Sequence, residues 1–133
     1  MPNGNGNGHC RHVVVIDPDF NYTHVLYQRI FENWRIAGVP FIDLKGFYAW
    51  LKRDDKTHVD LFIIDARIYK GTDAAILKQA RALVVRIRAR GYRGPILVTG
   101  EHFSLAQLRK VNNRADPGPK RFVPPYIIKA LKF

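Results

Sequence analysis

Acidic and hydroxyl side chains follow three separate apolar runs of this chain. Each run is short and rich in β-branched residues, a pattern typical of a buried strand. The side chains at or just beyond the ends of these runs are Asp17, Asp19, Asp65 and Thr99. If the strands form a parallel α/β sheet, these groups lie at the carboxyl edge, where such sheets bind ligands. Carboxylates and a hydroxyl at one edge could hold a hard cation and a phosphoryl group.

The apolar runs alternate with helical patterns along the whole chain. We expect strands at about 12–17, 39–42, 59–65, 95–99 and 121–123, and helices at about 22–37, 44–52, 72–90, from 104, and 126–131. Asn21 is a candidate N-cap and Gly38 a helix stop; Thr72 or Asp73 should begin the long helix, and Gly91 should end it. The segment 116–119 should break the fourth helix. This alternation predicts a parallel sheet with helices on both faces.

Length and composition predict one domain in a reducing compartment. The 133 residues suffice for one core, which we place at 12–133, after a flexible Gly/Asn-rich tail at 1–11. The amino-terminal sequence lacks the basic and apolar regions of a secretory signal, and Cys10 is the only cysteine. We therefore expect a cytoplasmic location.

The positive charge is concentrated in the second half of the chain. Residues 1–73 hold nine Lys/Arg and nine Asp/Glu, whereas residues 74–133 hold thirteen Lys/Arg and two acids, which accounts for the net charge of +11. Such a field attracts acidic protein surfaces, nucleic acid or lipid headgroups. The densest cluster comprises Arg86, Arg88, Arg90 and Arg93. A nucleic-acid or anionic-surface binding module is therefore one alternative.

The order of elements and the residues at the strand ends resemble the receiver domain of two-component response regulators. Asp65, at the end of Asp60-Leu61-Phe62-Ile63-Ile64-Asp65, matches the family's phosphate-accepting Asp. Thr99 matches the Thr or Ser that ends its fourth strand, and Asp17 matches the first acid of the cluster that follows its first strand. The resemblance implies a flavodoxin-like (βα)5 doubly wound parallel sheet with strand order 2-1-3-4-5. It implies Asp65 as phosphoacceptor, Thr99 as phosphate-site hydroxyl, and Mg²⁺ ligands from Asp17, Asp19, Asp65 and the backbone carbonyl of Arg67.

Two departures from the receiver pattern affect this chemistry. Pro18 stands where the family usually has a second acid, and Pro124-Pro125 replaces its Lys-Pro pair. Phosphorylation of a carboxylate needs a cation to offset the developing negative charge, and a Lys to pair with the phosphoryl oxygens. We therefore expect weak Mg²⁺ binding and a degenerate site at Asp65. The residues leave open whether Asp65 accepts phosphate or belongs to a pseudo-receiver.

The resemblance also implies how the domain acts. We expect a stand-alone signalling domain, not an enzyme, that works through regulated contact with an acidic protein surface or a sensor kinase. The sequence leaves the oligomeric state open, and a dimer is one of the alternatives. The expected contact surface is the fourth helix, fifth strand and fifth helix, with Arg109, Lys110, Arg114, Lys120, Arg121 and Lys129. A less favoured alternative is a small haloacid-dehalogenase-like phosphatase, because Asp17-Pro18-Asp19 resembles its Asp-x-Asp motif.

Overall fold

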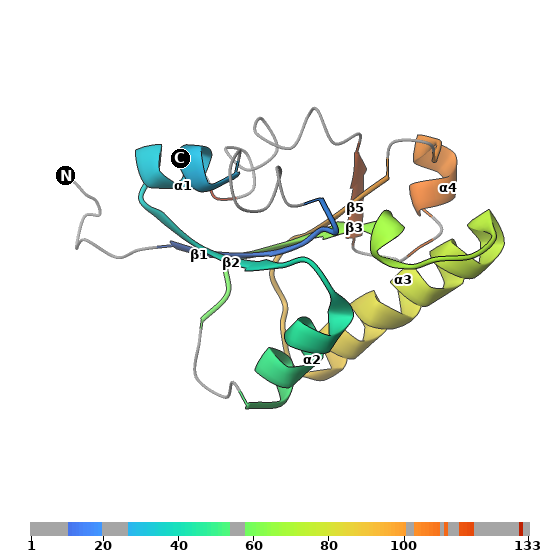
Figure 1. Cartoon of the computed structure of the whole chain (residues 1–133), viewed down its shortest axis with the longest axis horizontal. Helices are drawn as coiled ribbons and strands as arrows, with labels where there is room; N and C mark the ends of the chain where they lie inside the picture. Colours follow the sequence, from blue (N-terminus) through green and yellow to red (C-terminus); the bar gives the residue numbers. More distant parts are fainter. Residues whose placement is uncertain are drawn as a thin grey trace.

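Five parallel strands form a single sheet in this protein (Figure 1). The computed structural model describes residues 11–19, 27–53, 58–100, 103–109, 111, 115–118 and 131. The elements in chain order are β1 Arg11–Ile16, α1 Tyr27–Asn33, β2 Ile36–Phe41, α2 Leu44–Arg53, β3 Leu61–Asp65, the 3-10 helix η2 Ala66–Ile68, α3 Asp73–Ala89, β4 Ile96–Thr99, α4 Leu105–Arg109 and β5 Ala115–Gly118. The strand order is β2-β1-β3-β4-β5, which confirms the predicted (βα)5 topology.

The central strands are apolar on both faces because helices cover both sides of the sheet. Alternate residues of a strand point to opposite faces. Val14 of β1 and Ile64 of β3 pack with α2 and α3, whereas Val13 and Ile63 pack on the other face with Phe31 of α1. Figure 1 shows α1 on one side of the sheet, and α2 and α3 on the other. This two-sided burial explains the nearly continuous apolar runs in the sequence.

The long helix α3 begins and ends where its capping residues predict. The Thr72 hydroxyl accepts a hydrogen bond of 3.2 Å from the backbone N–H of Ala75, which confirms Thr72 as the N-cap. Gly91 has a φ of 97°, a left-handed conformation that glycine adopts at low cost, and it terminates the helix. No helix in the described ranges is long and apolar enough to cross a membrane.

The carboxyl-terminal end of α1 differs from its prediction. The helix ends at Asn33 and β2 starts at Ile36, whereas we expected helix to Ala37 with Gly38 as its stop. Arg35 takes the left-handed conformation, with a φ of 55°, and reverses the chain before Gly38 is reached. Gly38 lies within β2, where an added Cβ would meet the Phe31 ring, so glycine allows close packing of α1 on the sheet. The expected N-cap Asn21 and residues 22–26 lie outside the described residues.

The fifth strand also differs from its prediction. It spans Ala115–Gly118, where we expected a break, and the predicted strand 121–123 lies outside the described residues. Pro117 pairs in register with Val98 of β4. Proline is tolerated here because β5, within the described part of the chain, is an edge strand that pairs on one side only. Of the predicted helix 126–131, only Leu131 is described, and it is helical and buried.

Candidate functional site

Two carboxylates and a hydroxyl meet at the carboxyl edge of the sheet. Asp65 pairs in register with Thr99 on the neighbouring strand. Ile16 pairs with Ile64, which places Asp17, the residue after β1, beside Asp65, the last residue of β3. Among the described residues, Asp17, Asp65 and Thr99 are the three buried polar or charged side chains, each at most 1% exposed. Because burying polar groups is costly, their concentration at one edge marks this edge as the candidate site.

The Asp65 carboxylate is held by the side chain and backbone of Arg67. The guanidinium contacts both carboxylate oxygens, with Nε 3.2 Å from Oδ1 and 3.3 Å from Oδ2, and with Nη2 3.0 Å from Oδ2. The backbone N–H of Arg67 donates a further hydrogen bond of 2.9 Å to Oδ1. This geometry arises because Asp65 caps η2, which turns the chain so that Arg67 folds back over the acid. The result is a forked ion pair between a buried acid and a partly exposed base.

Sequence reasoning identified Arg67 only through its backbone carbonyl, as a metal ligand. The ion pair made by its side chain was missed. A cation two residues after an acid was visible in the sequence, but pairing at that spacing requires a tight turn. The structure supplies that turn as the 3-10 helix η2 from Ala66 to Ile68, between the expected strand 59–65 and the expected helix from 72.

Asp17 is also engaged by the local backbone. Its Oδ1 accepts a hydrogen bond of 2.9 Å from the backbone N–H of Asp19, across Pro18. The backbone N–H of Asp17 donates to the carbonyl of Phe41 at 3.0 Å, which continues the pairing of β1 with β2. Asp17 is therefore fixed at the edge, whereas Asp19, half-buried, lies one step further along the turn.

The Thr99 hydroxyl has no hydrogen-bond partner within the described part of the chain. A buried, unpaired hydroxyl costs about 1–3 kcal/mol. Gly100 follows it, and a Cβ there would crowd the Phe103 ring at 2.7 Å, so the chain packs tightly just beyond Thr99. An oxygen-rich group at the carboxyl edge would satisfy this hydroxyl.

The donor chemistry suits Mg²⁺, but the charge does not suit it well. Carboxylate and carbonyl oxygens from Asp17, Asp65 and Arg67 are the ligand types that Mg²⁺ prefers. Asp17 and Asp65 bring two negative charges, and the Arg67 guanidinium offsets one of them. No three His, Cys, Asp or Glu side chains within the described ranges are grouped to hold a metal ion. The residues therefore fit a strongly bound Mg²⁺ poorly.

Most of the expected partner-binding cations lie outside the described residues. Arg109 is the last residue of α4, and its backbone alone is described. The residues outside the described ranges are Lys110, Arg114, Lys120, Arg121 and Lys129. The proposed surface thus stays a prediction drawn from the sequence.

The arginines at the end of α3 make contacts within the fold. The Arg86 guanidinium lies 4.5 Å from the centre of the Tyr48 ring. Arg88 donates to the carbonyl of Gly94 at 2.6 Å, and Arg90 donates to the carbonyl of Leu51 at 2.7 Å. These contacts tie α3 to α2 and to the loop before β4. They give Arg86, Arg88 and Arg90 a structural role that does not require nucleic acid.

Comparison with known proteins finds similarity in structure alone. No protein-family profile and no curated protein sequence matches the chain significantly. A chemotaxis response regulator of Vibrio cholerae superposes with a TM-score of 0.64 at 16% identity, over 93% of this chain and 98% of that one. A response regulator receiver protein from Burkholderia phymatum gives a TM-score of 0.64 at 19% identity, over 90% of each chain. Full-length FixJ from B. japonicum gives 0.63 at 18% identity, over 92% of this chain and 56% of that one. At these identities the likeness establishes the fold, which is that of receiver domains.

Proposed function

Starting from this fold, we propose that the protein is an atypical receiver-type signalling domain that acts through regulated contact with another protein. The observation that carries the proposal is the Arg67 guanidinium, which already occupies both oxygens of the acid in the phosphoacceptor position. In a phosphorylatable site these oxygens must be available to the metal and to the incoming phosphorus. Here a side chain of the same polypeptide neutralises Asp65.

Weak Mg²⁺ binding follows from the same ion pair. Mg²⁺ would have to displace the forked, charge-assisted contact between Arg67 and Asp65. The site would also attract it less, because the guanidinium already reduces the net negative charge there. Pro18 also contributes no carboxylate where a second acid would strengthen binding. We propose that Asp17, Asp19, Asp65 and the Arg67 carbonyl hold Mg²⁺ weakly, and that Asp65 is phosphorylated little or transiently.

The partner is proposed to be an acidic protein surface, with a sensor kinase as one candidate. The second half of the chain has thirteen Lys/Arg against two acids, so its field attracts such a surface over a distance. The proposed surface comprises α4, β5 and the segment beyond them. The domain is proposed to have no catalytic activity of its own.

Treatment with acetyl phosphate and Mg²⁺, followed by intact mass, tests this function. We expect little or no added phosphate on the wild-type protein. Arg67→Gln keeps a polar side chain but removes the guanidinium, so it should raise both Mg²⁺ affinity and the phosphorylated fraction. Asp65→Asn in the Arg67→Gln background is the control that should abolish the added mass. Full, long-lived phosphorylation of wild-type Asp65 would contradict a degenerate site.

A further inference from the structure

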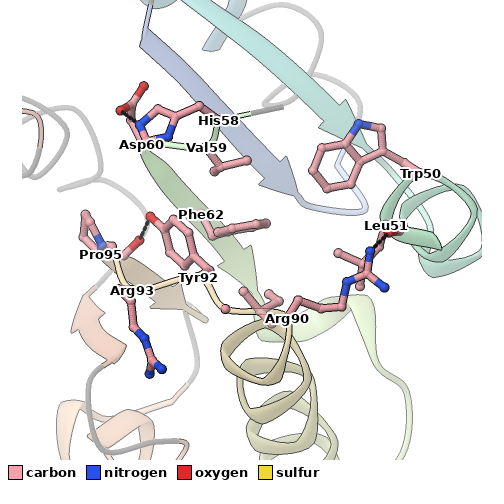
Figure 2. Close-up of a pocket in the computed structure, with 13 residues that line it drawn as sticks. Trp50, Leu51, His58, Val59, Asp60, Phe62, Arg90, Tyr92, Arg93 and Pro95 are labelled. Atoms are coloured by element: carbon pink, nitrogen blue, oxygen red, sulfur yellow. Dashed lines mark hydrogen bonds and ion pairs between the residues drawn. The ribbon is translucent and has the colours of Figure 1, made fainter. Parts of the chain in front are cut away.

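A cavity lies at the amino edge of the sheet, opposite the edge that carries Asp65. It is a cavity of about 730 Å³ between the end of α2, the starts of β3 and β4, and the loop after α3. Figure 2 shows Phe62 and Tyr92 in its middle, with His58 and Asp60 on one side and Trp50 with Arg90 on the other. Small-molecule sites typically enclose roughly 300–1,000 Å³, with apolar walls and a few polar groups. This cavity has a volume in that range, and its lining combines apolar side chains with a comparable share of polar groups.

The aromatic walls of the cavity are held in place by their own packing. The Trp50 ring lies 5.7 Å from Phe41 and 5.9 Å from Phe47, measured between ring centres. The Tyr92 ring meets Phe62 edge-on at 4.7 Å, and its hydroxyl donates to the carbonyl of Pro95 at 2.8 Å. Rings fixed before binding lose little entropy when a ligand stacks on them.

The charged groups at the rim favour an anion. Asp60 is the one acid among the described residues that line the cavity, and its carboxylate already makes contacts within the fold. One oxygen accepts from the backbone N–H of His12 at 2.9 Å, and the other lies 2.9 Å from His58 Nε2. Arg90 and Arg93 line the cavity as cations, and the bond from Arg90 to the Leu51 carbonyl holds its guanidinium at the rim. Among the described lining residues, two cations therefore stand against one acid.

We propose that this cavity, which we call the amino-edge pocket, binds a small flat aromatic molecule that carries a carboxylate or phosphate group. The aromatic part would stack against Trp50 and Tyr92, and the anionic group would lie at the rim within the positive field of Arg90 and Arg93, whose side chains lie on different sides of the pocket (Figure 2). The pocket lies beyond the start of β3, and Asp65 is the last residue of that strand. A ligand bound here would therefore lie at the opposite end of β3 from the phosphoacceptor position.

The test is an NMR titration of the ¹⁵N-labelled full chain with two anionic probes, adenosine 5′-monophosphate and 1-naphthoate. Adenosine and 1-naphthylmethanol are their uncharged counterparts. The chain has two tryptophans, so its two indole N–H signals report separately. The Trp50 signal should shift, and that of Trp34, which packs on the other face of the sheet, should stay in place. The phosphate and carboxylate probes together show which anionic group the pocket prefers.

Charge-matched variants make the result specific. Arg93→Gln should weaken binding of the preferred anion roughly two- to fivefold, the range expected for an exposed ion pair. Arg81→Gln removes one charge from an exposed position of α3 outside the pocket and should leave affinity unchanged. The proposal is overturned if neither anion shifts the Trp50 signal at millimolar concentration. It is equally overturned if the uncharged counterparts bind as well, or if Arg81→Gln weakens binding as much as Arg93→Gln.

Discussion

Replacing Arg67 by methionine should destabilise the protein, because it leaves a buried carboxylate without its counter-charge. The Asp65 side chain is 1% exposed and that of Arg67 is 34% exposed, so the pair lies between a surface and a buried ion pair. Exposed pairs contribute roughly 0–1 kcal/mol, and breaking a buried pair costs roughly 3–5 kcal/mol. The backbone N–H of Arg67 still donates to Asp65 in the variant. We therefore expect a loss of about 2 kcal/mol in the free energy of unfolding.

Urea denaturation at pH 7 measures this loss, and a double-mutant cycle assigns it to the pair. For a chain of this length, a loss of about 2 kcal/mol lowers the melting temperature by roughly 6–10 °C. The cycle compares Arg67→Met, Asp65→Asn and the double variant, and it should give a coupling energy of about 1 kcal/mol or more. Arg81→Met is the control, an equal change at an exposed helix position that should alter stability by less than about 0.5 kcal/mol. The reasoning fails if the coupling energy is indistinguishable from zero, or if Arg81→Met costs as much as Arg67→Met.

Gly38→Ala should cost about 1–3 kcal/mol in thermal or urea unfolding, because the new methyl group meets the Phe31 ring. Gly46→Ala, in the exposed first turn of α2, meets the Asp43 carboxylate at 3.3 Å rather than a buried ring and should cost less than Gly38→Ala. An equal loss in both variants would argue against close packing at Gly38. Burial raises the pKa of Tyr92 above its ordinary value, so the native state keeps this proton more tightly than the unfolded chain does. The stability that arises from this difference is fully present below about pH 10 and is lost as the pH rises toward the native pKa. The free energy of unfolding, measured between about pH 9 and 11, should therefore change less with pH in Tyr92→Phe than in the wild type.

The strand ends and α3 could be predicted because their signals are local. Asp65 and Thr99 each close an apolar run, and parallel strands that start and end together bring such residues to one edge. Thr72 and Gly91 are capping residues whose chemistry is sufficient to set the limits of α3. At these positions the conformation that the residue type prefers is also the one that the tertiary structure uses.

The misses occurred where a local signal was outweighed by its surroundings. Arg35 ends α1 in a left-handed conformation that arginine seldom adopts, while Gly38, the stronger stop signal, is used for packing instead. Pro117 and Gly118 are turn residues in isolation, yet they form the edge strand because β4 offers them a partner. The ion pair made by Arg67 depends on the turn after Asp65, which periodicity does not reveal.

Both outer strands of the sheet contain a proline. Pro40 lies in β2 and Pro117 in β5, the two strands at the ends of the order β2-β1-β3-β4-β5. An open sheet edge is a template on which another chain can add a strand, and each proline removes one of the N–H groups that such a strand would need. Addition of a partner's strand to the sheet (β-augmentation) and edge-to-edge aggregation are therefore disfavoured at both edges. The proposed contact with another protein would therefore use helices and loops, where side chains rather than backbone determine the choice of partner.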